Sequence, residues 1–315
     1  MSRTSPRRGL AIGCGGTVGA AWIAAALDSV ATALNWDPRE ADALVGTSAG
    51  AEFVTMLGSG VSVDDVVAMQ AGTSTDPVLA EHIRSAPGRL PPAPRLRWRL
   101  PERELLEAAK AGQGLLTWGS ALLPSGRGDA GWLQRMAERL NPGRTWVPHP
   151  ATWLAAMDYA TGQRVAFGSP EAPAATIGQA IRASWAIPGW FPPVPIAGRR
   201  YVDGGTASTA SVDLLLQLEL DELVVIAPMA STEPVPATGP ATALERQLRR
   251  RMSEQLDREV TGLRDNGTKV LRLHPDAEDL AVMGANFMDP RRRLATFEHS
   301  LSTTRRQLDQ HNGFR

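Results

Sequence analysis

The stretch "LVGTSAGA", Leu44 to Ala51, decides how this sequence folds. The apolar run Ala41–Gly46 predicts a buried strand, and the residues from Ser48 to about Leu57 predict a helix. Between them lies a G-x-S-x-G sequence, from Gly46 to Gly50. In such a strand-to-helix turn the serine is strained and projects its hydroxyl above the sheet. We therefore interpret Ser48 as a nucleophile.

Steric constraints explain why glycines flank Ser48. Side chains at Gly46 and Gly50 would collide with the neighbouring strand and helix. The N-terminus of the following helix also favours negative charge near the serine. The alternative interpretation is a glycine-rich packing turn without chemistry.

A second glycine-rich stretch, "GCGGTVG", runs from Gly13 to Gly19. It follows a predicted strand, Gly9–Ile12, and precedes a predicted helix, Gly19–Leu34, so several backbone N–H groups can converge on one point. Its spacing fits a dinucleotide fingerprint poorly, and no Gly-Lys-Ser/Thr follows as in a mononucleotide loop. We interpret the stretch as an oxyanion hole, which binds the negative charge that develops during acyl transfer.

The same N-terminal region resembles a secretion signal, because Arg7 and Arg8 precede apolar residues. The apolar run before Cys14 is shorter than the 7–15 residues typical of such signals. We also identify no apolar run of the roughly 18–20 residues that a membrane span needs. The sequence therefore favours a cytoplasmic protein, in peripheral contact with a membrane at most, over a secreted one.

Composition excludes several classes of protein. The formal net charge is zero, which argues against a nucleic-acid partner held by bulk electrostatics. Cys14 is the single cysteine, which excludes an internal disulfide and a multi-cysteine metal site. We expect no metal and no cofactor.

Two residues are candidates for the base that activates Ser48. Among the histidines, only His274, in "LRLHPD" after a predicted strand, is placed to complete a Ser–His triad. The other candidate is Asp203 in "YVDGG", where Gly204 and Gly205 let the backbone turn away sharply. Taken alone, this sequence is typical of a surface turn.

Apolar runs and helical stretches alternate along most of the chain, which favours an α/β fold on a largely parallel sheet. We predict a single domain over residues 1–315, with a core at about 9–230. An insertion is expected at about 72–128, and 231–315 adds a helix, a strand and a helix. The further elements expected are a hairpin of Ala151–Asp158 and Gln163–Gly168, helices Thr176–Ile187, Ser211–Leu220 and Ala243–Leu263, and a C-terminal helix from about Arg291.

The insertion contains a segment rich in proline and arginine, residues 84–103. This composition is incompatible with a regular core element. One interpretation is a surface excursion of loops and helices. The other is a lid or membrane-contacting segment, in which arginines meet phosphate head groups while Trp98 and Trp118 lie among acyl chains.

The order of these motifs resembles the patatin-like phospholipases: a glycine loop after the first strand, G-x-S-x-G after the second, and D-G-G much later. The stretch "ASWAIPGWFPPV", Ala183 to Val194, also looks like the region before the aspartate in that family. The resemblance covers about Gly9 to Leu220. It implies a three-layer α/β/α sandwich that hydrolyses lipid or other acyl esters through an acyl-enzyme.

Carried onto this sequence, the resemblance makes Ser48 the nucleophile and Asp203 the base of a dyad, with the N–H groups of Gly15, Gly16 and Thr17 as the oxyanion hole. Two departures stand out. Val18 occupies a position where members often have arginine or lysine, and "TASTASVDLL" follows the aspartate motif instead of an asparagine-proline pair. Ser211 in that stretch is predicted to cap a helix.

A dyad needs a basic aspartate, because a solvated carboxylate with a pKa near 3.9 is a feeble base. The apolar residues Trp185, Trp190 and Phe191 lie just upstream of Asp203. We therefore expect burial to raise the pKa of Asp203. Three alternatives remain open: an acyltransferase on the same dyad, a catalytically silent lipid or acyl binder, and a triad hydrolase that uses His274.

Overall fold

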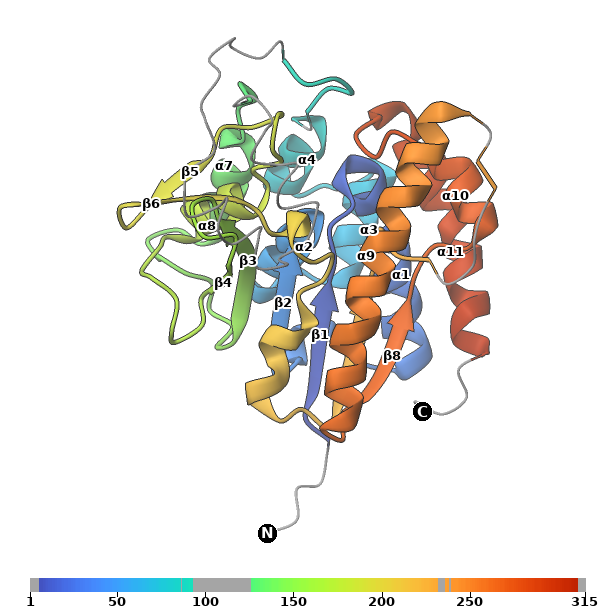
Figure 1. The fold of residues 1–315 in the computed structure, drawn as a ribbon, viewed down its shortest axis with the longest axis horizontal. Coiled ribbons are helices and arrows are strands. Elements are labelled where there is room, and N and C mark those ends of the chain that lie inside the picture. The colour runs from blue at the N-terminus through green and yellow to red at the C-terminus, as the bar shows by residue number, and fades with distance from the viewer. Residues whose placement is uncertain (1–5, 86, 93–125, 232–235, 238, 311–315) are drawn as a thin grey trace.

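The computed structural model describes residues 6–85, 87–92, 126–231, 236–237 and 239–310 (Figure 1). Its centre is an eight-stranded mixed sheet with the strand order β5-β6-β3-β2-β1-β7-β8, in which β4 also pairs with β3. The parallel part consists of β3 (Thr152–Asp158), β2 (Ala43–Thr47), β1 (Arg8–Ile12), β7 (Glu222–Ile226) and β8 (Lys269–Leu273). These strands are apolar almost throughout because helices cover both faces of the sheet.

The antiparallel part lies at one edge of the sheet. The predicted hairpin is confirmed, since β4 (Arg164–Phe167) pairs antiparallel with β3. β6 (Arg199–Asp203) also runs antiparallel to β3, and β5 (Val194–Ile196) completes the edge. β6 therefore runs opposite to β2, but its register with β3 places its last residue, Asp203, beside Ala156, level with the end of β2 that carries Ser48.

Alternate residues of the strands face two separate apolar clusters. In β1, Leu10 and Ile12 belong to the larger cluster, whereas Ala11 belongs to the smaller one. The larger cluster lies under α1 (Gly16–Leu34), α2 (Ala49–Gly58), α3 (Val63–Ala71), α4 (Pro77–Arg84), α7 (Gly131–Leu140), α8 (Ile177–Ser184), α10 (Ala277–Met283) and α11 (Arg293–Asp309). The smaller lies under α9 (Pro240–Asp265) and the 3₁₀ helix η3 (Val212–Leu218). Helices on both faces of the sheet (Figure 1) make the predicted three-layer α/β/α sandwich.

Helix α1 corrects one expectation. It is 19 residues long and apolar enough, by length and composition, to cross a membrane, and most of that window is buried inside the protein. Its indole at Trp22 donates to Asp279, and Ser29 shares a hydrogen bond of 2.7 Å with Thr304 of α11. A buried core helix passes the same length and composition test as a membrane span.

Other predictions were wrong in detail. α1 begins at Gly16 rather than Gly19, so that Gly16 and Thr17 belong to its first turn. The expected α-helix from Ser211 is the 3₁₀ helix η3. Ser211 precedes it in a left-handed conformation and makes no capping hydrogen bond with its side chain. Within the expected insertion, α4 is described, whereas Trp98 and Trp118 lie outside the described residues.

Candidate active site

Ser48 lies at a sharp turn between β2 and α2. Its backbone has φ 55° and ψ −118°, a strained conformation for a residue with a side chain. The N–H of Ser48 donates to Ser184 Oγ (2.9 Å), and the Ser184 hydroxyl donates to the carbonyl of Ala155 (2.7 Å). α8 therefore fixes the turn through Ser184, which is a role that the sequence analysis missed.

The glycines beside Ser48 are there for space, as predicted. A Cβ atom at Gly50 would lie 2.0 Å from the carbonyl oxygen of Ile12 in β1. A Cβ atom at Gly46 would lie 2.5 Å from the carbonyl oxygen of Gly50. A larger residue at either position would therefore push α2 away from β1 or β2.

The end of β6 brings Asp203 to Ser48. Asp203 pairs with Ala156 of β3, and the neighbouring Ala155 pairs with Thr47, the residue before Ser48. One strand thus separates the two backbones, roughly 10 Å at ordinary strand spacing, and the two side chains bridge this gap. The Ser48 hydroxyl hydrogen-bonds to the Asp203 carboxylate, and the N–H of Gly205 donates to Asp203 Oδ1 (2.7 Å).

The carboxyl group of Asp203 is almost completely enclosed, with 4% of the residue exposed. Burial raises its pKa to about 7, against the smaller opposing effects of the hydrogen bonds from Ser48 and from the Gly205 backbone. The prediction that this pKa is raised is confirmed. Near pH 7 the side chain can therefore both accept and release a proton.

The glycine loop after β1 presents several N–H groups on the side of the sheet that carries Ser48 and Asp203. The N–H of Cys14 donates to the Thr209 carbonyl (2.8 Å), and that of Val18 donates to the Phe287 carbonyl (2.9 Å). Between them, the N–H groups of Gly15, Gly16 and Thr17 have no acceptor among the residues that the structure describes. The two ends of the loop are thus fixed, and three consecutive donors are left for a ligand.

Close packing explains the glycines of this loop. Gly16 has φ +58°, and a Cβ atom there would lie 2.6 Å from the Phe287 ring. At Gly15 a Cβ atom would lie 2.7 Å from the Cα of Gly19, and at Gly13 it would lie 3.0 Å from the Thr209 carbonyl oxygen. Gly204 is similarly close to Ala155, 2.7 Å from its carbonyl oxygen.

His274 does not lie near Ser48. It follows β8, and the strands β7 and β1 separate β8 from β2. At ordinary strand spacing this is roughly 14 Å across the sheet. The structure therefore contradicts a triad of Ser48 with His274.

Cys14 is a buried free cysteine near Asp203. Burial and the nearby Asp203 charge raise the pKa of its thiol to about 12. Its sulfur lies 3.4 Å from Thr209 Oγ1. Over residues 6–85, 87–92, 126–231, 236–237 and 239–310, no group of three or more His, Cys, Asp or Glu side chains could hold a metal ion.

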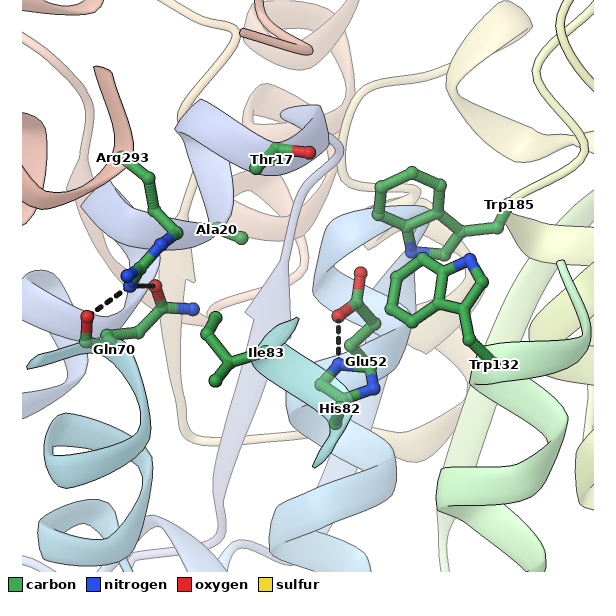
Figure 2. Close-up of a pocket in the computed structure, with 9 residues that line it drawn as sticks. All are labelled: Thr17, Ala20, Glu52, Gln70, His82, Ile83, Trp132, Trp185 and Arg293. Atoms are coloured by element: carbon green, nitrogen blue, oxygen red, sulfur yellow. Dashed lines mark hydrogen bonds and ion pairs between the residues drawn. The ribbon is translucent and has the colours of Figure 1, made fainter. Parts of the chain in front are cut away.

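A small pocket adjoins the glycine loop at Thr17. Figure 2 shows the side chains around it, which come from several helices of the larger apolar cluster. Glu52 of α2 and His82 of α4 lie within it, paired through Glu52 Oε2 and His82 Nε2 at 2.8 Å. The other lining residues are Thr17, Ala20, Gln70, Ile83, Trp132, Trp185 and Arg293.

The sequence of this chain matches a known protein family. A model of the patatin-like phospholipase family matches residues 10–216, about two thirds of the chain. A comparison with curated protein sequences gave no significant match.

Two solved structures match this chain over most of its length. VipD from Legionella pneumophila has 12% sequence identity and a TM-score of 0.43, and the match covers 98% of this chain and 67% of that protein. The type III effector protein ExoU has 17% identity and a TM-score of 0.38, with 97% of this chain and 53% of that protein covered. The chain thus spans about half the length of the second.

Proposed function

This chain belongs to the patatin-like phospholipase family, and from that membership we propose that it is a serine hydrolase of lipid or other acyl esters, with Ser48 and Asp203 as its dyad. One observation carries the proposal. A strained, nearly buried serine hydrogen-bonds to a carboxyl group whose pKa is raised to about 7. No ordinary packing requirement needs this pair.

The proposed reaction begins with proton transfer. Asp203 accepts the proton of Ser48 as Oγ attacks the ester carbonyl, and the N–H groups of Gly15, Gly16 and Thr17 bind the oxyanion. Collapse of this intermediate releases the alcohol, which takes the proton from Asp203. Water, activated by the same carboxylate, then hydrolyses the acyl-enzyme.

The shifted pKa makes the first step easier. A rise from 3.8 to about 7 brings the carboxylate closer in basicity to an alkoxide by on the order of 4 kcal/mol. The lower limb of the pH–rate profile should accordingly titrate near 7. An acylation rate that showed no ionisation above pH 4.5 would contradict this role of Asp203.

The experiment uses a fluorophosphonate probe together with p-nitrophenyl esters of graded chain length. We expect wild type to be labelled and to hydrolyse the esters, Ser48→Ala to do neither, and His274→Ala to behave as wild type. Labelling without hydrolysis would indicate acyl transfer or a narrower substrate. Absence of labelling in folded wild type would favour a silent lipid binder and overturn the proposal.

Membrane contact through residues 84–103 and a cytoplasmic location are further proposals. In support, Leu90 is 67% exposed, next to Arg89 in a segment that an apolar and cationic interface would accommodate. Sedimentation with anionic vesicles tests the contact. Binding that is unchanged in Leu90→Asp would argue against a role for Leu90 in it.

A further inference from the structure

A buried arginine lies close to the glycine loop, and the proposed mechanism does not use it. Arg249 of α9 is 2% exposed, and its guanidinium pairs with Glu245, one turn earlier in the same helix (2.8 Å). Burying such a pair removes two charges from water, and apolar residues of similar volume are often as stabilising. Stability is therefore not a sufficient reason for this arginine, and its remaining contacts indicate another role.

The other donors of Arg249 hold the turn that follows β7. Nη1 donates to the carbonyl of Pro228 (2.6 Å) and to the carbonyl of Ala230 (3.2 Å). Nη2 lies 3.8 Å from the sulfur of Met229. Because the guanidinium is rigid and planar, it fixes these three residues in one arrangement relative to α9.

The turn after β7 begins beside the glycine loop. β1 and β7 are parallel neighbours that end at the same level, at Ile12 and Ile226. The N–H of Gly13 donates to the Ile226 carbonyl (2.8 Å), so the loop and the turn leave the sheet side by side. α9 covers this part of the sheet (Figure 1), and its Leu256 shares the smaller apolar cluster with Ala11 of β1.

Pro228 connects Arg249 to the loop through packing. A Cβ atom at Gly15 would lie 2.8 Å from Pro228 Cγ, and one at Gly19 would lie 3.3 Å from Pro228 Cβ. The ring thus packs on the first of the three proposed oxyanion donors and on the residue two positions after the last. A shift of this ring would open space beside the N–H groups that we propose to bind the oxyanion.

The middle of the loop depends on this contact. Phe287 packs on Gly16, and it is fixed to the loop because its carbonyl accepts from the Val18 N–H (2.9 Å). Pro228 has no N–H group to donate, and its carbonyl accepts from Arg249. The position of the Pro228 ring is therefore set by α9.

We propose that Arg249 is a positioning residue for the oxyanion hole: it holds Pro228 against the glycine loop, so that the free N–H groups of the loop stay directed at the developing negative charge. The inference rests on the proposed function for the reaction, and it assigns a role in that reaction to α9, which lies outside the region matched by the family model. Donors that are already in place need no reorganisation during the reaction, so a small loss of order lowers kcat and leaves ground-state binding unchanged.

The main variant combines Arg249→Met with Glu245→Gln, so that neither buried charge is left without its partner. With p-nitrophenyl decanoate as substrate, we expect kcat to fall about tenfold and KM to stay within about twofold of wild type. A decyl trifluoromethyl ketone forms a tetrahedral oxyanion adduct with a nucleophilic serine. Its affinity should fall by the same factor as kcat/KM, since both depend on the oxyanion hole.

A second variant, Pro228→Ala, tests the contact through which Arg249 acts. It removes the ring atom nearest Gly15 and keeps the carbonyl that accepts from Arg249. We expect kcat to fall about fivefold, and the loss to stay near tenfold when this change is added to the main variant, because both release the same contact. Losses that multiply to about fiftyfold would mean that the two residues act independently and would overturn the proposal.

The matched control is Arg8→Met, at the opposite end of the same two strands. Arg8 begins β1 and pairs with Glu222 at the start of β7 (2.7 Å). Hydrogen exchange at the N–H groups of Val18 and Gly19, which are both hydrogen-bonded within the protein, is measured by NMR in all variants. Exchange there should be about tenfold faster than in wild type when Arg249 is replaced. Arg8→Met should leave both the exchange and kcat unchanged.

An unchanged kcat in the folded main variant would overturn the proposal, as would a change confined to KM or an equal loss of kcat in Arg8→Met. Wild type that hydrolyses no ester would refute the proposed hydrolase, and the exchange measurement then decides by itself whether Arg249 positions the loop. Exchange at Val18 and Gly19 that did not respond to the main variant would overturn the positioning role in either case.

Discussion

Asp203 and Asp279 are both buried, in two regions of the molecule that surround the carboxylate differently. At the end of β6, Asp203 is 4% exposed and accepts hydrogen bonds from the Gly205 N–H and the Ser48 hydroxyl. In α10, Asp279 is completely buried and accepts from Trp22 Nε1 (2.9 Å), Ser300 Oγ (3.0 Å) and Thr303 Oγ1 (2.8 Å).

The difference lies in the number of donors. Asp279 joins α1, α10 and α11 through these three side chains, and its Oδ2 also accepts from the Asp276 N–H (3.3 Å) at the start of α10. Asp203 has fewer donors, so that burial dominates and raises its pKa to about 7. At Asp203 the hydrogen bonds from Ser48 and Gly205 are too few to offset the effect of burial on its pKa.

The largest expected effect separates the two aspartates by activity. Asp203→Asn removes the proton acceptor and should lower kcat/KM for p-nitrophenyl esters by about 10³-fold or more. Asp279→Asn, assayed per folded molecule, should keep kcat/KM within about threefold of wild type. Comparable losses in both variants would mean that Asp203 is a structural aspartate like Asp279.

The second largest effect concerns the stability of the fold, to which the structural aspartate Asp279 contributes. Asp279→Ala removes the acceptor of the buried donors Trp22 Nε1 and Ser300 Oγ and should lower the free energy of unfolding by about 3–4 kcal/mol, measured by urea denaturation at pH 7. The control is Asp28→Ala, which removes a more exposed carboxylate paired with Arg305 at 2.9 Å. Its cost should stay below about 1 kcal/mol. Equal costs would show that the donors around Asp279 contribute little.

The sequence predicted one of these regions well and the other hardly at all. Ser48 and Asp203 stand in short motifs because glycines must flank them, and the close contacts at Gly46 and Gly50 show why no other residue fits. The alternation of strands and helices was also sufficient to predict an α/β fold on a largely parallel sheet, and the resemblance to the patatin-like phospholipases implied its three layers. These features depend on local backbone geometry, which leaves a pattern in neighbouring residues.

Asp279 and the pocket leave no such pattern. The partners of Asp279 lie 257 positions away at Trp22 and 24 at Thr303. Glu52 and His82 are 30 positions apart, on different helices. Phe287, which fixes the glycine loop through the Val18 N–H, lies beyond the region matched by the family model. Tertiary packing alone brings such residues together, so spacing along the chain does not predict them.

A smaller effect tests the unusual pKa of Asp203 through stability. The unfolded-state pKa is near 3.9 and the folded value is about 7. Between these values the folded state binds the proton more tightly, so this group stabilises the fold below pH 4 and its contribution is lost as the pH rises through 7.

Asp203→Asn should therefore be more stable than wild type by on the order of 2 kcal/mol at pH 8, after allowance for relaxation around the charge. The difference should shrink toward zero at pH 4. Urea denaturation of both proteins across this range measures it. A difference that did not change with pH would mean that Asp203 ionises as a solvated carboxylate does.

The smallest expected effect comes from replacing a serine by alanine, once beside Ser48 and once beside Asp279. Ser184→Ala removes the acceptor of the Ser48 N–H and the donor to the Ala155 carbonyl. Ser300→Ala removes one of the donors to Asp279. Each should cost about 1 kcal/mol of stability, the ordinary value of a buried hydrogen bond.

Only Ser184→Ala should also affect catalysis, because the turn that it holds orients the nucleophile. A slight relaxation of that turn moves Oγ away from Asp203, and we expect kcat to fall about tenfold with little change in KM. Ser184→Thr keeps the hydroxyl and should restore part of the rate, which a purely structural loss would not explain. If both alanine variants lowered kcat equally, the fixed turn at Ser48 would have no special influence on the reaction.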